Sequence, residues 1–188
     1  MRVIAGKYRS RRLRSLPGLD LRPTADRLRE TLFDVLAAGR PAALEGSLWI
    51  DLYAGTGAVG IEALSRGAGM VYFVESSAQG AALIRRNLQS LGLEAGFQVL
   101  ETNADRALGK LEAEGAEADV VFLDPPYRMQ AEYRQVLGAL AGSKLLKPST
   151  KIIAQHQRQF DPGEVFRSVA RYRKLEQGDS ALSFYRRI

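Results

Sequence analysis

The stretch S-L-W-I-D-L-Y-A-G-T-G-A-V-G-I-E-A-L, residues 47–64, indicates the class of fold. Residues 47–53 form an apolar run typical of a buried strand. From Gly57 to Arg66 the pattern becomes helical, and Gly67 ends it. Three glycines, Gly55, Gly57 and Gly60, lie in the turn and at the start of the helix, where a side chain would keep a ligand away from the turn and from the helix N-terminus. A strand, a glycine-rich turn and a helix in this order predict the first part of a βαβ unit.

The same alternation continues along the chain. Strands are expected at residues 70–75, 97–101, 119–123 and 151–156, and helices at residues 78–91, 104–114 and 132–141. An earlier helix is expected from its cap at Thr24 to the stop at Gly39 and Pro41. Residues 165–177 and 180–188 are expected to form two strands with no helix between them. The pattern predicts an α/β, Rossmann-like sheet, mostly parallel, with an antiparallel C-terminal strand pair.

Acidic side chains occupy two of the expected strands near their carboxyl ends, the edge where such sheets bind ligands. Asp51 precedes Gly55 by four residues, and a carboxylate there would repel a pyrophosphate but suit a cationic or hydroxylated ligand. It could instead hold the N-terminus of the next helix. Glu75 ends the following strand and can hold both hydroxyls of a ribose, or it is an ordinary strand-end acid.

The segment T-N-A-D-R-A-L, residues 102–108, follows the third strand of the series. Asn103 with the backbone of Ala104 is the first candidate for reading the edge of an adenine, and Asp105 is the second. Either side chain could instead cap the helix that follows.

The stretch V-V-F-L-D-P-P-Y-R-M, residues 120–129, ends an apolar strand in a rigid corner. Proline lacks the N–H that a sheet ladder needs, so the two prolines could simply stop the strand. A rigid corner rich in hydrogen-bond acceptors could also hold a flat amine. The residues alone leave both interpretations open.

Composition excludes several classes of protein. The chain has 188 residues, no cysteine and one histidine, His156, so disulfides and thiolate metal sites are excluded and a zinc site is disfavoured. No apolar run approaches the roughly 20 residues of a membrane span, and the N-terminus lacks the apolar region of a signal peptide. We expect a cytoplasmic protein without a metal.

The basic residues gather at the two ends of the chain. Residues 1–29 carry nine Lys and Arg against two acids, residues 167–188 carry six against two, and residues 30–166 carry twelve against seventeen. The N-terminal residues 2–16 read as a short hairpin, with Gly6 and Ser10 allowing close backbone approach. Such a cluster predicts a nucleic-acid surface, although a solvated basic tail remains the alternative.

Four collinear motifs carry a resemblance to a known family. They are M-R-V-I-A-G-K-Y-R-S-R-R-L at residues 1–13, L-R-P-T-A-D-R-L-R-E-T-L-F-D-V-L at 21–36, D-L-Y-A-G-T-G-A-V-G-I-E-A-L-S-R-G-A at 51–68, and F-L-D-P-P-Y at 122–127. The chain resembles the class I S-adenosylmethionine-dependent methyltransferases. Within them it is similar to the enzymes that methylate the N2 amino group of a guanine in 16S ribosomal RNA.

The resemblance implies S-adenosylmethionine as cofactor and small-subunit ribosomal RNA as partner. The Asp124 carboxylate and the Pro125 carbonyl would accept hydrogen bonds from the amine, Pro126 would help fix the corner, and Tyr127 would stack on an unpaired base. The cofactor would contact Thr24, Asp51, Tyr53, Gly55, Thr56, Gly57, Glu75, Ser76, Asn103 and Ala104. The RNA would contact Lys7, Arg9, Arg11, Arg12, Arg14 and Arg22.

The resemblance also implies a division into an RNA-binding extension, residues 1–22, and a methyltransferase domain, residues 23–188. Thr24 and Arg22 have a local alternative, a helix cap and an exposed charge. Gln155 stands where the family leads us to expect glutamate, and we expect that departure to affect only a peripheral role. A monomer is expected, and free RNA and a ribosomal particle both remain open as substrate.

Three rival functions stay in view. An amino-group methyltransferase could act on adenine in DNA or on another RNA, because the corner recognises an amine and not a particular base. The glycine spacing alone would also suit a nicotinamide-dependent oxidoreductase. The third rival is a non-catalytic RNA-binding module, against which the intact acids Asp51, Glu75 and Asp124 argue.

Overall fold

The computed structural model describes residues 1–15, 23–38 and 41–188, with the backbone alone at residues 23–25 and 41. The described residues form one eight-stranded sheet in the order β3-β2-β1-β4-β5-β8-β7-β6. The strands are β1 (Leu48–Leu52), β2 (Met70–Val74), β3 (Phe97–Leu100), β4 (Ala118–Leu123), β5 (Leu146–Gln157), β6 (Val165–Phe166), β7 (Val169–Gln177) and β8 (Ser180–Arg187). The first five are parallel to one another, and β8 pairs antiparallel with both β5 and β7.

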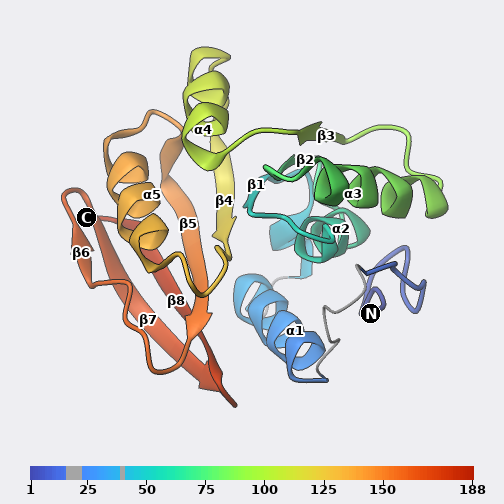
Figure 1. The fold of residues 1–188 in the computed structure, drawn as a ribbon, viewed down its shortest axis with the longest axis horizontal. Helices are drawn as coiled ribbons and strands as arrows, with labels where there is room; N and C mark the ends of the chain where they lie inside the picture. Colours follow the sequence, from blue (N-terminus) through green and yellow to red (C-terminus); the bar gives the residue numbers. More distant parts are fainter. Residues whose placement is uncertain (16–22, 39–40) are drawn as a thin grey trace.

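Helices cover both faces of the sheet (Figure 1). They are α1 (Pro23–Ala37), α2 (Ala58–Ser65), α3 (Ala78–Ser90), α4 (Ala104–Ala113) and α5 (Gln130–Gly142), with a short 3-10 helix η1 (Pro41–Leu44). Alternate residues of β1 serve the two faces, because successive side chains of a strand point in opposite directions. Trp49 packs in the core beneath α1, α2 and α3, whereas Ile50 packs in the core beneath α4 and α5.

The predicted α/β class, the mostly parallel sheet and the antiparallel C-terminal pair are confirmed. One predicted strand, residues 165–177, is divided into β6 and β7 by a turn in which Arg167 has a φ of 49°. The first helix begins at Pro23, so Thr24 lies inside its first turn and not at its cap. Proline suits that position because its missing N–H would have no partner there. No helix in the described part of the chain combines the length and hydrophobicity needed to cross a bilayer.

The N-terminal segment, residues 1–15, folds back on itself as a hairpin with a single bridge between Arg2 and Arg12. Its Val3 and Leu13 are buried in the core beneath α1, α2 and α3. The fully buried Glu62 of α2 anchors it by accepting hydrogen bonds from the N–H groups of Ile4 and Ala5 at 2.8 and 2.9 Å. The segment therefore packs as part of the fold.

A second anchor joins the segment to α2 and α3. Asn87 of α3 accepts a hydrogen bond from the Arg14 N–H and donates one to the Arg14 carbonyl. A Cβ at Gly6 would lie 1.8 Å from the Ser65 carbonyl oxygen of α2. The close approach expected of Gly6 toward a nucleic acid is therefore made within the protein itself.

Candidate active site

The sheet register brings polar residues from four strands to one edge. Leu52 of β1 pairs with Val74 of β2 and with Leu123 of β4, which itself pairs with Ala154 of β5. The residues that follow therefore share one row: Tyr53, Glu75, Asp124 and Gln155. The chain passes from β1 toward β3 in one direction and from β4 toward β5 in the other. The row thus spans the point where the strand order reverses, where such sheets bind ligands.

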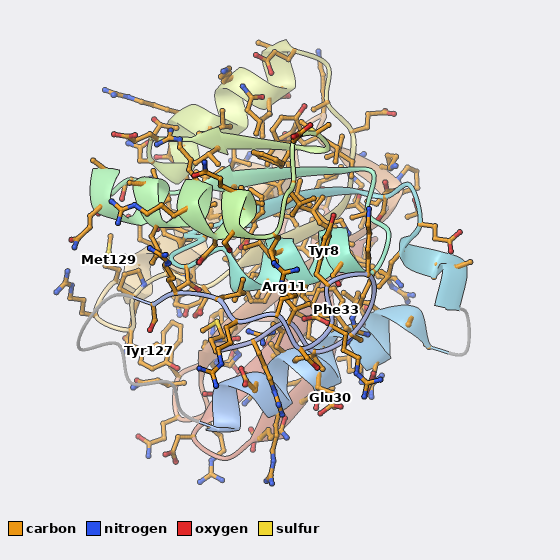
Figure 2. The ribbon with its side chains drawn as sticks, turned by 90° about the vertical axis from the view of Figure 1, so that its right-hand side faces the viewer. Tyr8, Arg11, Glu30, Phe33, Tyr127 and Met129 are labelled. Carbon is orange, nitrogen blue, oxygen red and sulfur yellow. The ribbon has the colours of Figure 1, made fainter. Side chains whose placement is uncertain are left out.

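A cavity of about 410 Å³ opens at this edge. Its lining combines the strand ends with the proline corner: Tyr53, Gly55, Glu75, Ser76, Asp124, Pro125, Pro126, Tyr127 and Met129. The volume falls in the range of small-molecule sites, roughly 300–1,000 Å³. Tyr127 and Met129 lie at the left margin of the face seen in Figure 2. The structure thus brings much of the expected cofactor set together with the whole corner, and it adds Met129, which the sequence did not single out.

Asp51 takes the alternative role, as the partner of the next helix. It is buried, with 2% of its surface exposed, and its Oδ2 accepts a hydrogen bond of 2.9 Å from the Gly60 N–H of α2. Burial, with the nearby charges of Asp124 and Glu75, raises the pKa of Asp51 to about 7. The carboxyl is not part of the cavity lining.

Two of the three glycines, Gly57 and Gly60, are needed for the packing and start of α2 and not for access of a ligand. A Cβ at Gly60 would lie 2.3 Å from the Phe73 ring, so this glycine is needed for the packing of α2 on β2. Gly57 has a φ of 76° and begins α2 beside Ile84. Only Gly55, with a φ of 56°, lines the cavity. Of the three positions, therefore, it is the one where a side chain would meet a ligand.

Glu75 stabilises the turn as well as facing the cavity. Its Oε2 accepts a hydrogen bond from the Gly55 N–H at 2.9 Å, and its Oε1 accepts one from the Ser77 N–H at 2.8 Å. Each carboxylate oxygen can accept more than one hydrogen bond, so both keep capacity for a pair of hydroxyls. The geometry fits the ribose role expected of Glu75.

The other expected cofactor residues whose side chains the structure describes do not line the cavity. Asn103 caps α4, since its Oδ1 accepts a hydrogen bond from the Arg106 N–H at 2.9 Å, and Asp105 accepts one from Gln135 at 2.6 Å. Ala104 is buried. Thr56 directs its hydroxyl toward the Met1 sulfur at 3.6 Å. The Thr24 side chain and the whole of Arg22 lie outside the described residues.

Asp124 and Gln155 form a polar pair at the centre of the row. The Gln155 Nε2 donates a hydrogen bond of 2.8 Å to Asp124 Oδ2, and the Tyr133 hydroxyl of α5 donates one of 2.7 Å to the Gln155 carbonyl. Burial raises the pKa of Asp124 to about 7. The expectation that Gln155 plays only a peripheral role is wrong, because it contacts the carboxylate at the proline corner.

The corner itself presents an aromatic ring to solvent. Met129 N–H donates to the Pro126 carbonyl at 2.7 Å, which closes a tight turn after the two prolines. Tyr127 is 42% exposed and makes no hydrogen bond through its hydroxyl within the described residues. Pro125 is buried, and its carbonyl has the Tyr133 hydroxyl as its nearest donor at 3.4 Å. The corner therefore offers a free ring beside the Asp124 carboxylate, which is more than a strand stop requires.

The basic side chains of the N-terminal segment divide into two groups. Arg11 donates a hydrogen bond of 2.8 Å to the Ser90 carbonyl at the end of α3, and Lys7 lies 5.5 Å from the centre of the Tyr8 ring. Arg9, Arg12 and Arg14 are exposed and make no salt bridge within the described residues. Figure 2 shows the segment crossing the face whose left margin carries Tyr127. Arg11 of the segment and Tyr127 of the corner are therefore seen on the same face of the molecule.

Comparison with known proteins gives one family and several relatives. The sequence model of a family described as "Conserved hypothetical protein 95" matches residues 1–186. A Bacillus subtilis protein named "Putative rRNA methyltransferase YlbH" is 31% identical over 100% of this chain and 99% of its own length. The "Ribosomal RNA small subunit methyltransferase D" of Haemophilus influenzae is 34% identical over 84% of this chain and 79% of its own.

The solved structures agree. One described as "Putative methyltransferase yhhF from Escherichia coli" superposes with a TM-score of 0.81 at 30% identity, over 100% of this chain and 97% of that one. The solved structure shares the fold of the chain, and these proteins align with it over most of their length at 30–34% identity.

Proposed function

The chain belongs to the Conserved hypothetical protein 95 family, and we propose that it transfers a methyl group from S-adenosylmethionine to the N2 amino group of a guanine in small-subunit ribosomal RNA. It is a class I S-adenosylmethionine-dependent methyltransferase of the small-subunit ribosomal RNA type. The proposal of a guanine N2 target rests on one observation: Glu75, Gly55 and the corner residues Asp124–Tyr127 line the same cavity.

The cavity suits the cofactor in charge as well as in size. Glu75 and Asp124 lie on its lining, and the buried Asp51 is close enough to both for their charges to raise its pKa. Clustered carboxyls favour a cation and disfavour a pyrophosphate, which supports a sulfonium ligand over a nicotinamide dinucleotide. When bound, S-adenosylmethionine supplies an electrophilic methyl group. Glu75 would hold its ribose hydroxyls, and Tyr53, Ser76 and Met129 would line its path.

The corner suits an exocyclic amine. Such a nitrogen is a weak nucleophile because its lone pair is delocalised into the base. The Asp124 carboxylate, held by Gln155, would accept a hydrogen bond from the amine, stabilise the positive charge that develops on nitrogen and take the departing proton. Tyr127 would stack on the base, which must then be unpaired or flipped out of its helix.

The rate of methyl transfer should depend on the ionisation of Asp124. Burial raises the pKa of Asp124 to about 7. Below that pH the carboxylate is increasingly protonated, and it can then neither stabilise the positive charge on the amine nor take its proton. The titratable groups near it are Asp51 on β1 and Tyr133 on α5, and Glu75, which follows β2, lines the same cavity. The single-turnover rate is therefore expected to rise with pH and to reach half its maximum near pH 7.

Gln155→Glu tests this dependence. A second carboxyl beside Asp124 disfavours ionisation, and the pair would share a proton, so the midpoint is expected to move upward by about 1–3 pH units. The matched control is Gln135→Glu, which places a carboxyl beside the surface residue Asp105 and should leave the profile unchanged. An identical midpoint in Gln155→Glu would show that Asp124 does not control the rate.

The N-terminal segment is proposed to bind the RNA backbone. Arg9, Arg12 and Arg14 have no acidic partner among the described residues and would each neutralise a phosphate. Replacing all three with alanine should weaken RNA binding and lower the salt slope by about 2, at roughly 0.7 per contact for a single strand. Arg11 is kept, since it caps α3. S-adenosylmethionine affinity is the control, and an unchanged salt slope would make the segment a solvated surface.

The rival substrates are separated by direct comparison. Labelled S-adenosylmethionine is offered with unmodified small-subunit ribosomal RNA, with assembled small subunits and with adenine-containing DNA. Transfer to RNA or to the particle and not to DNA is the expected result. Preferential transfer to DNA would replace the proposed substrate, and calorimetric binding of a nicotinamide cofactor in place of S-adenosylmethionine would overturn the activity.

A further inference from the structure

A second cavity lies on the outer side of the proline corner. It has a volume of about 320 Å³ and is lined by Tyr127, Gln157, Arg158, Gln159, Asp179 and Ser180. Tyr127 also lines the first cavity, so its exposed ring is common to both. The second cavity contains none of the residues expected to bind S-adenosylmethionine, and the methyl-transfer chemistry does not use it.

Two turns build this cavity. Gln157 ends β5 and pairs with Ser180, the first residue of β8. The Arg158 N–H donates a hydrogen bond of 2.9 Å to the carbonyl of Asp179, which lies in the turn between β7 and β8 beside Gly178. These backbone contacts hold the side chains of both turns around one opening.

The polar side chains of the cavity are available to a ligand. Gln157, Arg158, Gln159 and Asp179 are exposed, and within the described residues their side chains make no hydrogen bond or salt bridge. The set holds a guanidinium, a carboxylate and two amides. A phosphate would be repelled by Asp179, whereas the edge of a nucleobase offers both acceptors to Arg158 and N–H donors to Asp179.

We propose that this cavity binds the base of the unpaired nucleotide next to the target in the RNA strand. The inference rests on the proposed function and names a second contact of the same substrate. A ring has two faces, so Tyr127 can stack on the target base in the first cavity and on its neighbour in the second. A guanine meets the requirement, since its Watson–Crick edge carries an acceptor at O6 beside donors at N1 and N2.

The substitution Asp179→Asn distinguishes binding of a base in this cavity from binding of a phosphate. If a base donates to the carboxylate, the substitution weakens RNA binding; if a phosphate lies there, removal of the negative charge strengthens it. Arg158→Ala is expected to weaken binding in either case. For a base contact we expect on the order of tenfold for each variant, with the salt slope little changed, because the contact releases few counterions.

The controls are two exposed residues at the end of α4, Lys110 and Glu114, which form a salt bridge of 3.7 Å. Lys110→Ala removes a positive charge as Arg158→Ala does, and Glu114→Gln removes a negative charge as Asp179→Asn does. Neither control should change RNA affinity. The measurements are the Kd for unmodified small-subunit ribosomal RNA, kcat/KM for methyl transfer to it, and the Kd for S-adenosylmethionine. Cofactor affinity should be the same in all variants.

Three outcomes would overturn the inference. Tighter RNA binding by Asp179→Asn would make the cavity a phosphate site. Wild-type RNA affinity and kcat/KM in both Asp179→Asn and Arg158→Ala would make it an empty surface hollow, with the proposed function intact. A wild-type protein that transfers no methyl group to RNA would overturn the proposed function and this inference with it.

Discussion

Asp124→Ala is expected to slow single-turnover methyl transfer by about 10²–10³, by analogy with the loss of one preorganised hydrogen-bonding group at a reacting centre. The carboxylate faces the corner, and Gln155 is its one side-chain partner among the described residues. The groups proposed to bind the cofactor, Glu75 and Gly55, keep their own hydrogen bond without it. S-adenosylmethionine affinity should therefore stay nearly unchanged, as measured by calorimetry.

Two variants sharpen this prediction. Asp124→Asn keeps the size of the side chain and removes its charge, so a comparable loss of rate would assign the effect to the carboxylate. Asp119→Asn, at the other end of β4 where Asp119 pairs with Lys147, is the matched control and should transfer methyl normally. Wild-type rates in Asp124→Ala would mean that the corner only ends the strand. Loss of cofactor binding would move the carboxylate into the cofactor site.

Glu75→Ala is expected to weaken S-adenosylmethionine binding by about 1.5–3 kcal/mol, the range for hydrogen bonds to a charged group. Two effects combine. The variant loses the acceptors proposed for the ribose hydroxyls, and it releases the N–H groups of Gly55 and Ser77 that shape the turn. Titration calorimetry measures the affinity, and thermal unfolding checks that the fold is retained.

The matched control is Glu101→Ala. Glu101 follows β3 as Glu75 follows β2, but it pairs with Arg85 on the surface and does not line the cavity. It should bind S-adenosylmethionine as the wild type does. An unchanged affinity in Glu75→Ala would show that the ribose is held elsewhere.

The sequence predicted the layers of the fold because apolar runs separated by helical periods leave few arrangements. It did not predict the break between β6 and β7. Residues 165–177 have one continuous strand-like composition, and the break depends on the left-handed backbone of Arg167. Nor did it predict the anchoring of the N-terminal segment. Glu62 and Asn87 look like ordinary helix residues until the segment packs on them.

The sequence predicted the candidate site residues that directly follow a strand. Glu75 and Asp124 follow apolar runs, so their place at the edge follows from the topology alone. Asp51 and Gln155 depended on partners from other elements. Asp51 accepts a hydrogen bond from the Gly60 N–H of α2, and the register of β4 with β5 brings Gln155 to Asp124. The periodicity of a sequence does not reveal such contacts, although a polar residue directly after the apolar residues 152–154 of a buried strand was a signal for Gln155.

Nucleoside analysis after methyl transfer shows directly whether the protein methylates the N2 amino group of a guanine. Unmodified small-subunit ribosomal RNA and small subunits lacking the modification are incubated with labelled S-adenosylmethionine and the wild-type protein, then digested to nucleosides. We expect label in N2-methylguanosine, and we expect that label to be lost when Asp124→Ala replaces the wild type. Label in N6-methyladenosine, or label that persists in Asp124→Ala, would contradict it.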